Sequence, residues 1–316
     1  MSIYVAIPSL GDYELEHTID NLIFLSDNPQ KITVGVATMS TDSEFKKLTK
    51  KYAKNKNVII KKFKFSEHGG VGKGRKCAMH SYSGQDYLLQ IDSHTLLQKG
   101  WDTFLLDLYG KALEETKNSK TILTAYLGRY SHTAQGRKNI DVEPRYPMFV
   151  PGYLLQGNYK IPRWKDTPMA EFPEDKRRSE PFLPCTKFNA NFAFGNKEFA
   201  SNTGLFLESE FFEEEILQTY NLLGNGFSFV FPNQPIPLFH LYTDDITEPP
   251  LGGRTYAGNM PKPKDFDPET LMREHYLGYI NDPSNQPQLE KFHEYSQVHP
   301  KYGSPRQWYI PTTYTF

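Results

Sequence analysis

An aspartate and a histidine two residues apart, Asp92 and His94, directly follow a short apolar run from Tyr87 to Ile91. This run is typical of a buried strand, and side chains two positions apart leave an extended backbone on the same side. Carboxylate oxygens and imidazole nitrogens are both ligands of divalent metals. The sequence therefore predicts a divalent-metal site at the end of this strand, with Ser93 between the two ligands.

A third protein ligand is expected, because two ligands alone would hold a metal weakly. His240 is the best candidate, since it lies in a second strand-like segment, residues 237–242. A histidine at a strand end can also be purely structural, and both interpretations stay open. Oxygen donors favour Mg²⁺ or Mn²⁺, and the imidazoles shift the preference toward Mn²⁺.

A glycine-rich segment, residues 68–76, precedes the metal motif and carries Lys73 and Arg75. Its spacing excludes a P-loop, which would need a glycine in place of Glu67 and a Ser or Thr after the lysine. We interpret the segment as a flexible loop that brings Lys73 and Arg75 to a phosphate at the start of a helix, residues 77–82. A glycine-rich surface turn without a ligand is the alternative.

The charge of the chain is unevenly distributed. The net charge is −1, yet residues 46–76 contain twelve Lys and Arg against one acid, a local charge of +11. This asymmetry indicates a polyanion or phosphate near that face of the molecule. A solvated lysine-rich helix is the alternative for residues 46–56.

The first half of the chain alternates between apolar strand-like runs and amphipathic helical stretches. This alternation predicts an α/β fold with a mostly parallel sheet and helices on both faces. Ligands of such sheets bind beyond the carboxyl ends of the strands, where Ser9 and the metal motif are expected. The expected strands are residues 3–7, 32–37, 58–60, 87–91 and 121–126, and the expected helices are residues 14–25, 43–52 and 105–115.

The second half is less regular. Residues 128–185 lose periodicity and are rich in proline and glycine, which predicts an irregular insertion that forms a lid or an acceptor groove. Strand-like segments follow at 188–195, 227–231 and 237–242, and helices are expected at 216–220, 268–280 and around 286–298.

Acids crowd just before the helix at residues 216–220, among them Glu214 and Glu215. Acids in the first turn of a helix complement its dipole, which explains most of them structurally. One of them can still face the reaction centre.

The composition limits the class of protein. Two cysteines, Cys77 and Cys185, have no metal-like spacing and do not form a disulfide framework. The N-terminus has neither a basic stretch nor a long apolar one, and no window approaches the roughly eighteen apolar residues of a membrane span. We expect a protein that is soluble, cytoplasmic and free of membrane contacts.

Several motifs occur in a fixed order across residues 3–242, about three quarters of the chain. They resemble the motifs of the GlcNAc-transferase family of GT-A glycosyltransferases, which includes cytoplasmic enzymes that modify hydroxyproline, and their viral relatives. The block formed by Gln90 to His94 and Gly100 to Asp102 is specific, and each of the others alone is weak. The remaining matches are Ser9, Asp12, Glu14, Leu15, Thr18 and Ile19; Gly70 and Arg75; Phe192 to Gly195; Glu214 to Ile216; and His240 with Tyr242.

The sequence departs from the family pattern at two places. Leu10 and Gly11 replace a common Tyr-Arg pair, and acids replace a Gly-Gly pair before Glu214 and Glu215. The first departure bears on the identity of the donor. The second bears on the roles that the resemblance implies for Glu214 and Glu215.

The resemblance implies a GT-A (Rossmann-like) domain at residues 1–242, with an insertion at 128–185 and a C-terminal extension at 243–316. It implies transfer of a hexose or pentose from a UDP-sugar with retention at the anomeric carbon. The implied metal ligands for Mn²⁺ or Mg²⁺ are Asp92, His94 and His240. The implied donor-binding residues are Ser9 and Asp12 at the nucleoside, Lys73 and Arg75 at the diphosphate, and Asp92 with Ser93; Glu214 or Glu215 would orient the acceptor hydroxyl or act as its base.

Two acceptors fit this resemblance: a hydroxymethylated pyrimidine in DNA and a protein hydroxyl. The basic segment and a basic, aromatic C-terminal tail slightly favour DNA, because phosphate neutralisation supplies much of DNA affinity. A base within a duplex would have to be flipped out. An inactive sugar- or nucleic-acid-binding module is the main alternative, which the complete metal set disfavours. A metal-dependent phosphohydrolase is disfavoured because a second carboxylate cluster is absent from the sequence.

Overall fold

The computed structural model describes residues 1–63, 70–133, 136–142, 149–156, 162–168, 181–185, 187–202, 209, 213–242 and 268–296. Its centre is an eight-stranded sheet in the order β11-β13-β6-β12-β4-β1-β2-β3. Only β11 and β12 run against the common direction, so the predicted mostly parallel sheet is confirmed. The strands are β1 (Ile3–Leu10), β2 (Ile32–Met39), β3 (Val58–Lys62), β4 (Tyr87–Ile91), β6 (Thr121–Thr124), β11 (Phe182–Cys185), β12 (Phe192–Asn196) and β13 (Ser228–Pro232).

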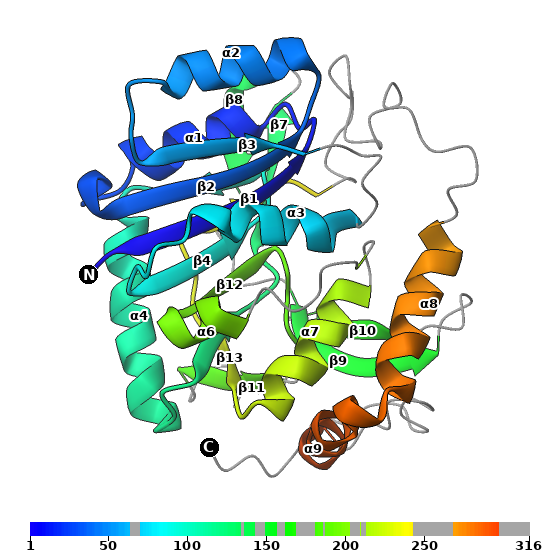
Figure 1. Cartoon of the computed structure of the whole chain (residues 1–316). Helices are drawn as coiled ribbons and strands as arrows, with labels where there is room; N and C mark the ends of the chain where they lie inside the picture. The colour runs from blue at the N-terminus through cyan, green and yellow to red at the C-terminus, as the bar shows by residue number, and fades with distance from the viewer. Residues whose placement is uncertain are drawn as a thin grey trace.

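Helices cover this sheet, as the alternation of the sequence predicts. The central strands are buried on both faces, with Val5 and Leu89 on one face and Tyr4 and Leu88 on the other fully excluded from solvent, which explains their nearly continuous apolar runs. Figure 1 shows α3 crossing in front of β1 and β4. The helices are α1 (Leu15–Phe24), α2 (Asp42–Tyr52), α3 (Gly70–Ala78), α4 (Trp101–Thr116), α6 (Lys197–Asn202) and α7 (Glu213–Gly224).

The glycine-rich segment forms a helix where a flexible loop was expected. Residues 70–78 are α3, which packs against β1 and β2, while residues 68–69 lie outside the described residues. A Cβ atom at Gly74 would lie 3.1 Å from the Cβ atom of Pro8 on β1. Glycine therefore lets this helix approach the sheet closely, and this packing offsets its low helix propensity.

A smaller sheet lies beside the carboxyl end of β4, in the order β5-β14-β7-β8. Its strands are β5 (Thr95–Leu97), β14 (Leu238–His240), β7 (Gly128–Thr133) and β8 (Gly136–Val142). The antiparallel pair β9 (Phe149–Gln156) and β10 (Pro162–Pro168) follows in the chain. The described parts of the expected irregular insertion are thus mostly paired strands. β7, β8 and β10 are mostly polar and β9 is interrupted by Pro151 and Gly152, so these strands give no periodic signal.

Two helices from the C-terminal part pack against α7: α8 (Pro268–Asn281) and α9 (Gln286–Ser296). Figure 1 shows both beside α7, at one end of the molecule. Tyr220 of α7 stacks with Tyr279 of α8 and meets Phe292 of α9 edge to face. Both predicted helices are confirmed, while residues 243–267 and 297–316 lie outside the described residues. None of the described helices has the length and apolar character needed to cross a membrane.

Candidate metal and donor site

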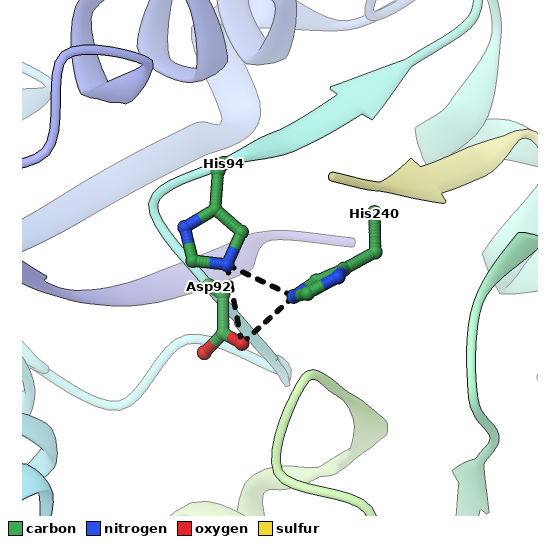
Figure 2. A group of neighbouring side chains, drawn as sticks. All are labelled: Asp92, His94 and His240. Atoms are coloured by element: carbon green, nitrogen blue, oxygen red, sulfur yellow. Dashed lines mark hydrogen bonds and ion pairs between the residues drawn. The ribbon is translucent and has the colours of Figure 1, made fainter. Parts of the chain in front are cut away.

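Three ligand atoms converge just beyond the carboxyl end of β4. Nε2 of His94 lies 2.9 Å from Nε2 of His240, and Oδ2 of Asp92 lies 3.1 Å from His240 Nε2 and 3.8 Å from His94 Nε2. Figure 2 shows the three side chains pointing toward one another. His240 arrives there because β14 pairs with β5 antiparallel and sets His240 opposite Thr95. The three residues that the sequence separates by up to 148 positions thus form one cluster.

The imidazole of His94 is oriented by Asp12. Nδ1 of His94 lies 2.6 Å from Oδ2 of Asp12, which also accepts a 2.8 Å hydrogen bond from Oγ of Ser93. The backbone N–H of Glu14 donates to Oδ1 of Asp12. Burial opposes ionisation of Asp12, but His94 and these hydrogen bonds outweigh it and lower its pKa from 3.8 to about 2. An anionic Asp12 fixes the proton on Nδ1 and leaves Nε2 of His94 as a metal ligand.

The turn that carries His94 is fastened to α1 by Thr18. The Thr18 hydroxyl donates to the carbonyl oxygens of Ser93 and Thr95, at 2.9 and 3.0 Å, and accepts from the N–H of Thr95. The turn is also closed by Oγ1 of Thr95, which donates to the carbonyl of Asp92. Asp12 and Thr18 thus have a structural role, since both hold the turn that carries His94.

Arg75 of α3 reaches the same cluster from the other side. Its Nη2 donates to Oδ1 of Asp92 at 3.0 Å, its Nε to Oε1 of Glu214 at 2.9 Å, and its Nη1 to the carbonyl of Ile91. Burial opposes ionisation of Asp92, but the Arg75 charge, a hydrogen bond with His240 and the imidazoles hold its pKa well below its usual range. All three guanidinium nitrogens of Arg75 are occupied by the protein, so it holds Asp92 with Oδ2 toward the imidazoles.

Glu214 and Glu215, at the start of α7, have different surroundings. The side chain of Glu214 is 5% exposed, and that of Glu215 is 21% exposed. Burial raises the pKa of Glu214 to about 7; Arg75 opposes this rise, and the charges of Glu215 and Asp92 add to it. Glu214 is therefore a buried partner of Arg75, whereas Glu215 remains accessible.

The donor set fits a divalent metal. One carboxylate oxygen and two imidazole nitrogens can coordinate together, because these atoms all lie within 4.8 Å of one another. Such a set suits Mn²⁺ or Mg²⁺ and leaves positions for phosphate oxygens. Among the described residues this is the only group of three or more such side chains placed in this way.

The other expected donor residues lie at the same edge of the sheet. Ser9 is the residue before the last of β1 and is buried, and its Oγ has no hydrogen-bond partner within the described part of the chain. Lys73 is half-buried on α3, two residues before Arg75. The structure therefore gives Ser9 an unused hydroxyl close to β4 and places Lys73 on the helix that supports Asp92.

The motif Gly100-Trp101-Asp102 is structural. Asp102 is buried and accepts hydrogen bonds from the backbone N–H groups of Asp27 and Asn28, at 2.8 and 3.0 Å. Trp101 is fully buried, and Gly100 has a positive φ of 77° at the start of α4. This block fastens α4 to the end of α1 and takes no part in the metal cluster.

Sequence reasoning missed Lys187 and Tyr126. Lys187 Nζ lies 3.2 Å from Oε2 of Glu215 and 2.6 Å from the Tyr126 hydroxyl. Neither residue stands in a recognisable motif, and Lys187 is 28 positions from its partner. A lysine inside an apolar, aromatic stretch was the one available signal, because a buried ammonium needs a partner.

Comparison with known proteins agrees with this geometry. A model of the family described as Glycosyltransferase (GlcNAc) matches residues 38–250, more than half of the chain. No curated protein matches. The chain resembles the crystal structure of GalNAc-T7 with UDP, GalNAc and Mn²⁺, with a TM-score of 0.57 and 16% identity over 94% of this chain and 55% of that chain. It also resembles S. aureus TarS 1–349 in complex with UDP-GlcNAc, with a TM-score of 0.51 and 16% identity over 94% of this chain and 72% of that chain.

The chain thus spans about 55% of the length of the GalNAc-T7 chain. At this level of identity the two likenesses show a shared fold, which is the GT-A fold. Together with the family match, they show that the chain belongs to the GlcNAc glycosyltransferase family.

Proposed function

We propose that the protein moves a sugar from a UDP-sugar to a hydroxyl group on a macromolecule, with the help of Mn²⁺ or Mg²⁺. The observation that carries this proposal is the convergence of Asp92, His94 and His240 at the carboxyl end of β4. GalNAc-T7 was solved with UDP, GalNAc and Mn²⁺, and TarS with UDP-GlcNAc, which supports UDP as the nucleotide and Mn²⁺ as the metal here.

In the transfer, the bond between the anomeric carbon and the β-phosphate oxygen breaks, and its electron pair leaves on UDP. The acceptor oxygen bonds to the anomeric carbon and gives its proton to a base, the role proposed for Glu214 or Glu215. A bound metal would supply positive charge for the departing diphosphate. The chain itself orients the metal ligands: Asp12 fixes His94, and Arg75 fixes Asp92. Ser9 and Asp12 near the nucleoside, Lys73 at the diphosphate, and retention at the anomeric carbon remain proposals from the family resemblance.

We propose residues 1–242 as the catalytic domain, with residues 128–185 inserted and residues 243–316 as an extension. The packing of α8 and α9 on α7 supports an extension that rests on this domain. A cytoplasmic location fits the two free cysteines.

DNA with a hydroxymethylated pyrimidine is the slightly favoured acceptor. Some lysines of the basic segment are neutralised, because Lys47 and Lys51 pair with acids of α1 and Lys62 pairs with Asp42. Five others are exposed and pair with none of the described residues, which leaves a positive surface along α2 and the end of β3. They are Lys46, Lys50, Lys54, Lys56 and Lys61. This surface supports binding of a polyanion.

The first experiment measures turnover of a panel of UDP-sugars, with mass spectrometry of DNA and protein acceptors, with and without EDTA. We expect transfer that EDTA abolishes, and its loss in Asp92→Ala and His94→Ala. Asp107→Asn on the exposed face of α4 is the control and should keep full activity. Full metal-dependent activity in Asp92→Ala or His94→Ala would overturn the proposed site. Binding of a UDP-sugar without transfer to any acceptor would favour the inactive binding module instead.

The second experiment addresses the acceptor. Binding to hydroxymethylated DNA should weaken steeply between 50 and 200 mM salt, roughly as expected for several phosphate contacts. Replacing three of the five lysines, Lys46, Lys50 and Lys54, by alanine should reduce the slope of this salt dependence. If the protein does not bind hydroxymethylated DNA even at low salt, DNA is excluded as the acceptor, and a protein hydroxyl is the acceptor that remains.

A further inference from the structure

Lys187 is a buried cation next to the candidate reaction centre. Its side chain is 2% exposed, and it precedes β12 in the segment that runs toward the metal cluster. Its ammonium contacts the carboxylate of Glu215 and the hydroxyl of Tyr126, and it lies 4.3 Å from the centre of the Tyr126 ring. A buried ammonium is costly without an anionic partner, and Glu215 is the carboxylate that Lys187 contacts.

Glu215 is held on both of its oxygens. Oε2 faces Lys187 and lies 3.4 Å from the Tyr126 hydroxyl, while Oε1 accepts the backbone N–H of Ala190 at 3.0 Å. Two fixed oxygens define the direction of the carboxylate, even though its side chain retains 21% exposure. An oriented and accessible carboxylate can accept a hydrogen bond from a hydroxyl group.

The same segment lies beside the metal cluster. β12 pairs with β4 so that Phe192 stands opposite Ile91, the residue before Asp92. The carbonyl of Ala190 accepts a hydrogen bond from Gln90 of β4. The backbone that holds Oε1 of Glu215 is therefore fastened to the strand that carries the metal motif.

Glu214 is placed differently, although it is the neighbouring residue. Its Oε1 accepts from Nε of Arg75, which in turn holds Asp92. Glu214 thus supports the metal ligand from behind and is nearly excluded from solvent, with 5% exposure.

From this difference we propose that Lys187 is a positioning residue for Glu215, and that Glu215 rather than Glu214 faces the acceptor hydroxyl. This inference rests on the proposed function, since it assigns the acceptor side of the same site. Lys187 acts through Glu215: together with Tyr126 it sets the orientation of the carboxylate.

The kinetic test compares Lys187→Met, Lys187→Arg and wild type in the metal-loaded protein. Lys187→Met should lower kcat for transfer about 10- to 100-fold, the range for residues that orient a reacting group, while the affinity for the UDP-sugar stays within about twofold. Lys187→Arg should recover part of kcat. Lys120→Met is the control, because the Lys120 ammonium also lies near an aromatic ring, but it bonds a backbone carbonyl at the far end of β6. An unchanged kcat in Lys187→Met, or an equal loss of donor affinity, would overturn the proposal.

The two glutamates are separated in the same assays. Glu215→Gln should lose transfer with unchanged affinity for Mn²⁺ and donor, whereas Glu214→Gln should weaken Mn²⁺ binding through Arg75 and Asp92. The reverse pattern would assign the acceptor side to Glu214 and refute the inference.

Thermal unfolding tests the ion pair without any acceptor. Glu215→Gln leaves the Lys187 ammonium buried without its carboxylate, so its Tm should lie below that of the double variant Lys187→Met/Glu215→Gln. Equal or additive Tm changes would show that the pair is not coupled. If the wild-type protein binds no UDP-sugar, the proposed function is wrong. The Tm values of the single and double variants still show whether Lys187 and Glu215 are coupled.

Discussion

The orientation of His94 by Asp12 predicts a defined loss of metal affinity in Asp12→Asn. The substitution keeps the size of the side chain but removes the charge that receives Nδ1–H of His94. The lowering of the Asp12 pKa from 3.8 to about 2 corresponds to about 2 kcal/mol of interaction with its partners, net of the opposing cost of burial. Loss of a group that orients a metal-bound histidine typically lowers the affinity for the metal 10- to 100-fold, which is about 1.4–2.7 kcal/mol. This range is similar to the energy obtained from the pKa of Asp12.

The assay is calorimetric titration of metal-free protein with Mn²⁺ at pH 7.5. We expect the Kd of Asp12→Asn to rise about 10- to 100-fold, and a smaller rise for Ser93→Ala, which removes one hydrogen bond to the same oxygen. Circular dichroism checks the fold, and Asp107→Asn serves as the surface control. A Kd for Asp12→Asn within twofold of wild type would refute the orienting role of Asp12.

Three further predictions concern stability. Asp102→Asn should lower the free energy of unfolding by about 1–3 kcal/mol without changing Mn²⁺ affinity, because Asp102 accepts two backbone N–H groups far from the cluster. Gly35→Ala should lower the free energy of unfolding, measured by urea denaturation, by about 3 kcal/mol or more, because the new Cβ atom would overlap the Tyr4 hydroxyl. Gly110→Ala is the control: its Cβ atom would meet open space on α4, so the free energy of unfolding should stay the same or rise. In EDTA, protonated Glu214 contributes to the free energy of unfolding, because its pKa is raised to about 7 in the folded protein. This contribution is fully present below pH 4.5 and is lost as the pH rises through 7. Glu214→Gln should remove this decline.

Each of these has a clear contrary outcome. A weaker Mn²⁺ affinity in Asp102→Asn would tie the Gly-Trp-Asp block to the metal after all. Equal stability of Gly35→Ala and Gly110→Ala would mean that the approach of Tyr4 to β2 is not tight. A difference between wild type and Glu214→Gln that stays constant from pH 4.5 to 7.5 would show that burial does not perturb this carboxyl group.

The elements with strong apolar patterns could be predicted from the sequence. β4 is observed with the expected bounds, and β1 and β2 run slightly longer than their apolar cores. α3 could not be predicted as a helix, because Gly70, Gly72 and Gly74 have low helix propensity and the close packing on β1 that stabilises it is a tertiary effect. The paired strands within residues 128–168 were not predicted as strands, because proline and polar residues interrupt the alternation of polar and apolar residues that is typical of a strand.

The site was predictable where a residue type alone specifies its chemistry. The metal cluster unites the three expected residues, Asp92, His94 and His240. The partners of Arg75 could not be predicted, since an arginine in a glycine-rich segment suits phosphate binding as well as a buried ion pair. Whether an ammonium such as that of Lys187 meets a carboxylate is likewise decided by the packing of distant segments.

The position of β12 has a consequence for how the protein folds. This strand separates β4 from β6, so the two neighbours have no partner on their facing edges until residues 192–196 insert between them. Unpaired strand edges favour association with other chains, and late long-range pairing slows folding. We expect a chain truncated before residue 187 to aggregate, and a nascent chain to acquire Mn²⁺ binding only after β14 has emerged. The candidate metal site therefore closes only after both sheets have formed, and of the described α-helices only α8 and α9 remain to pack against α7.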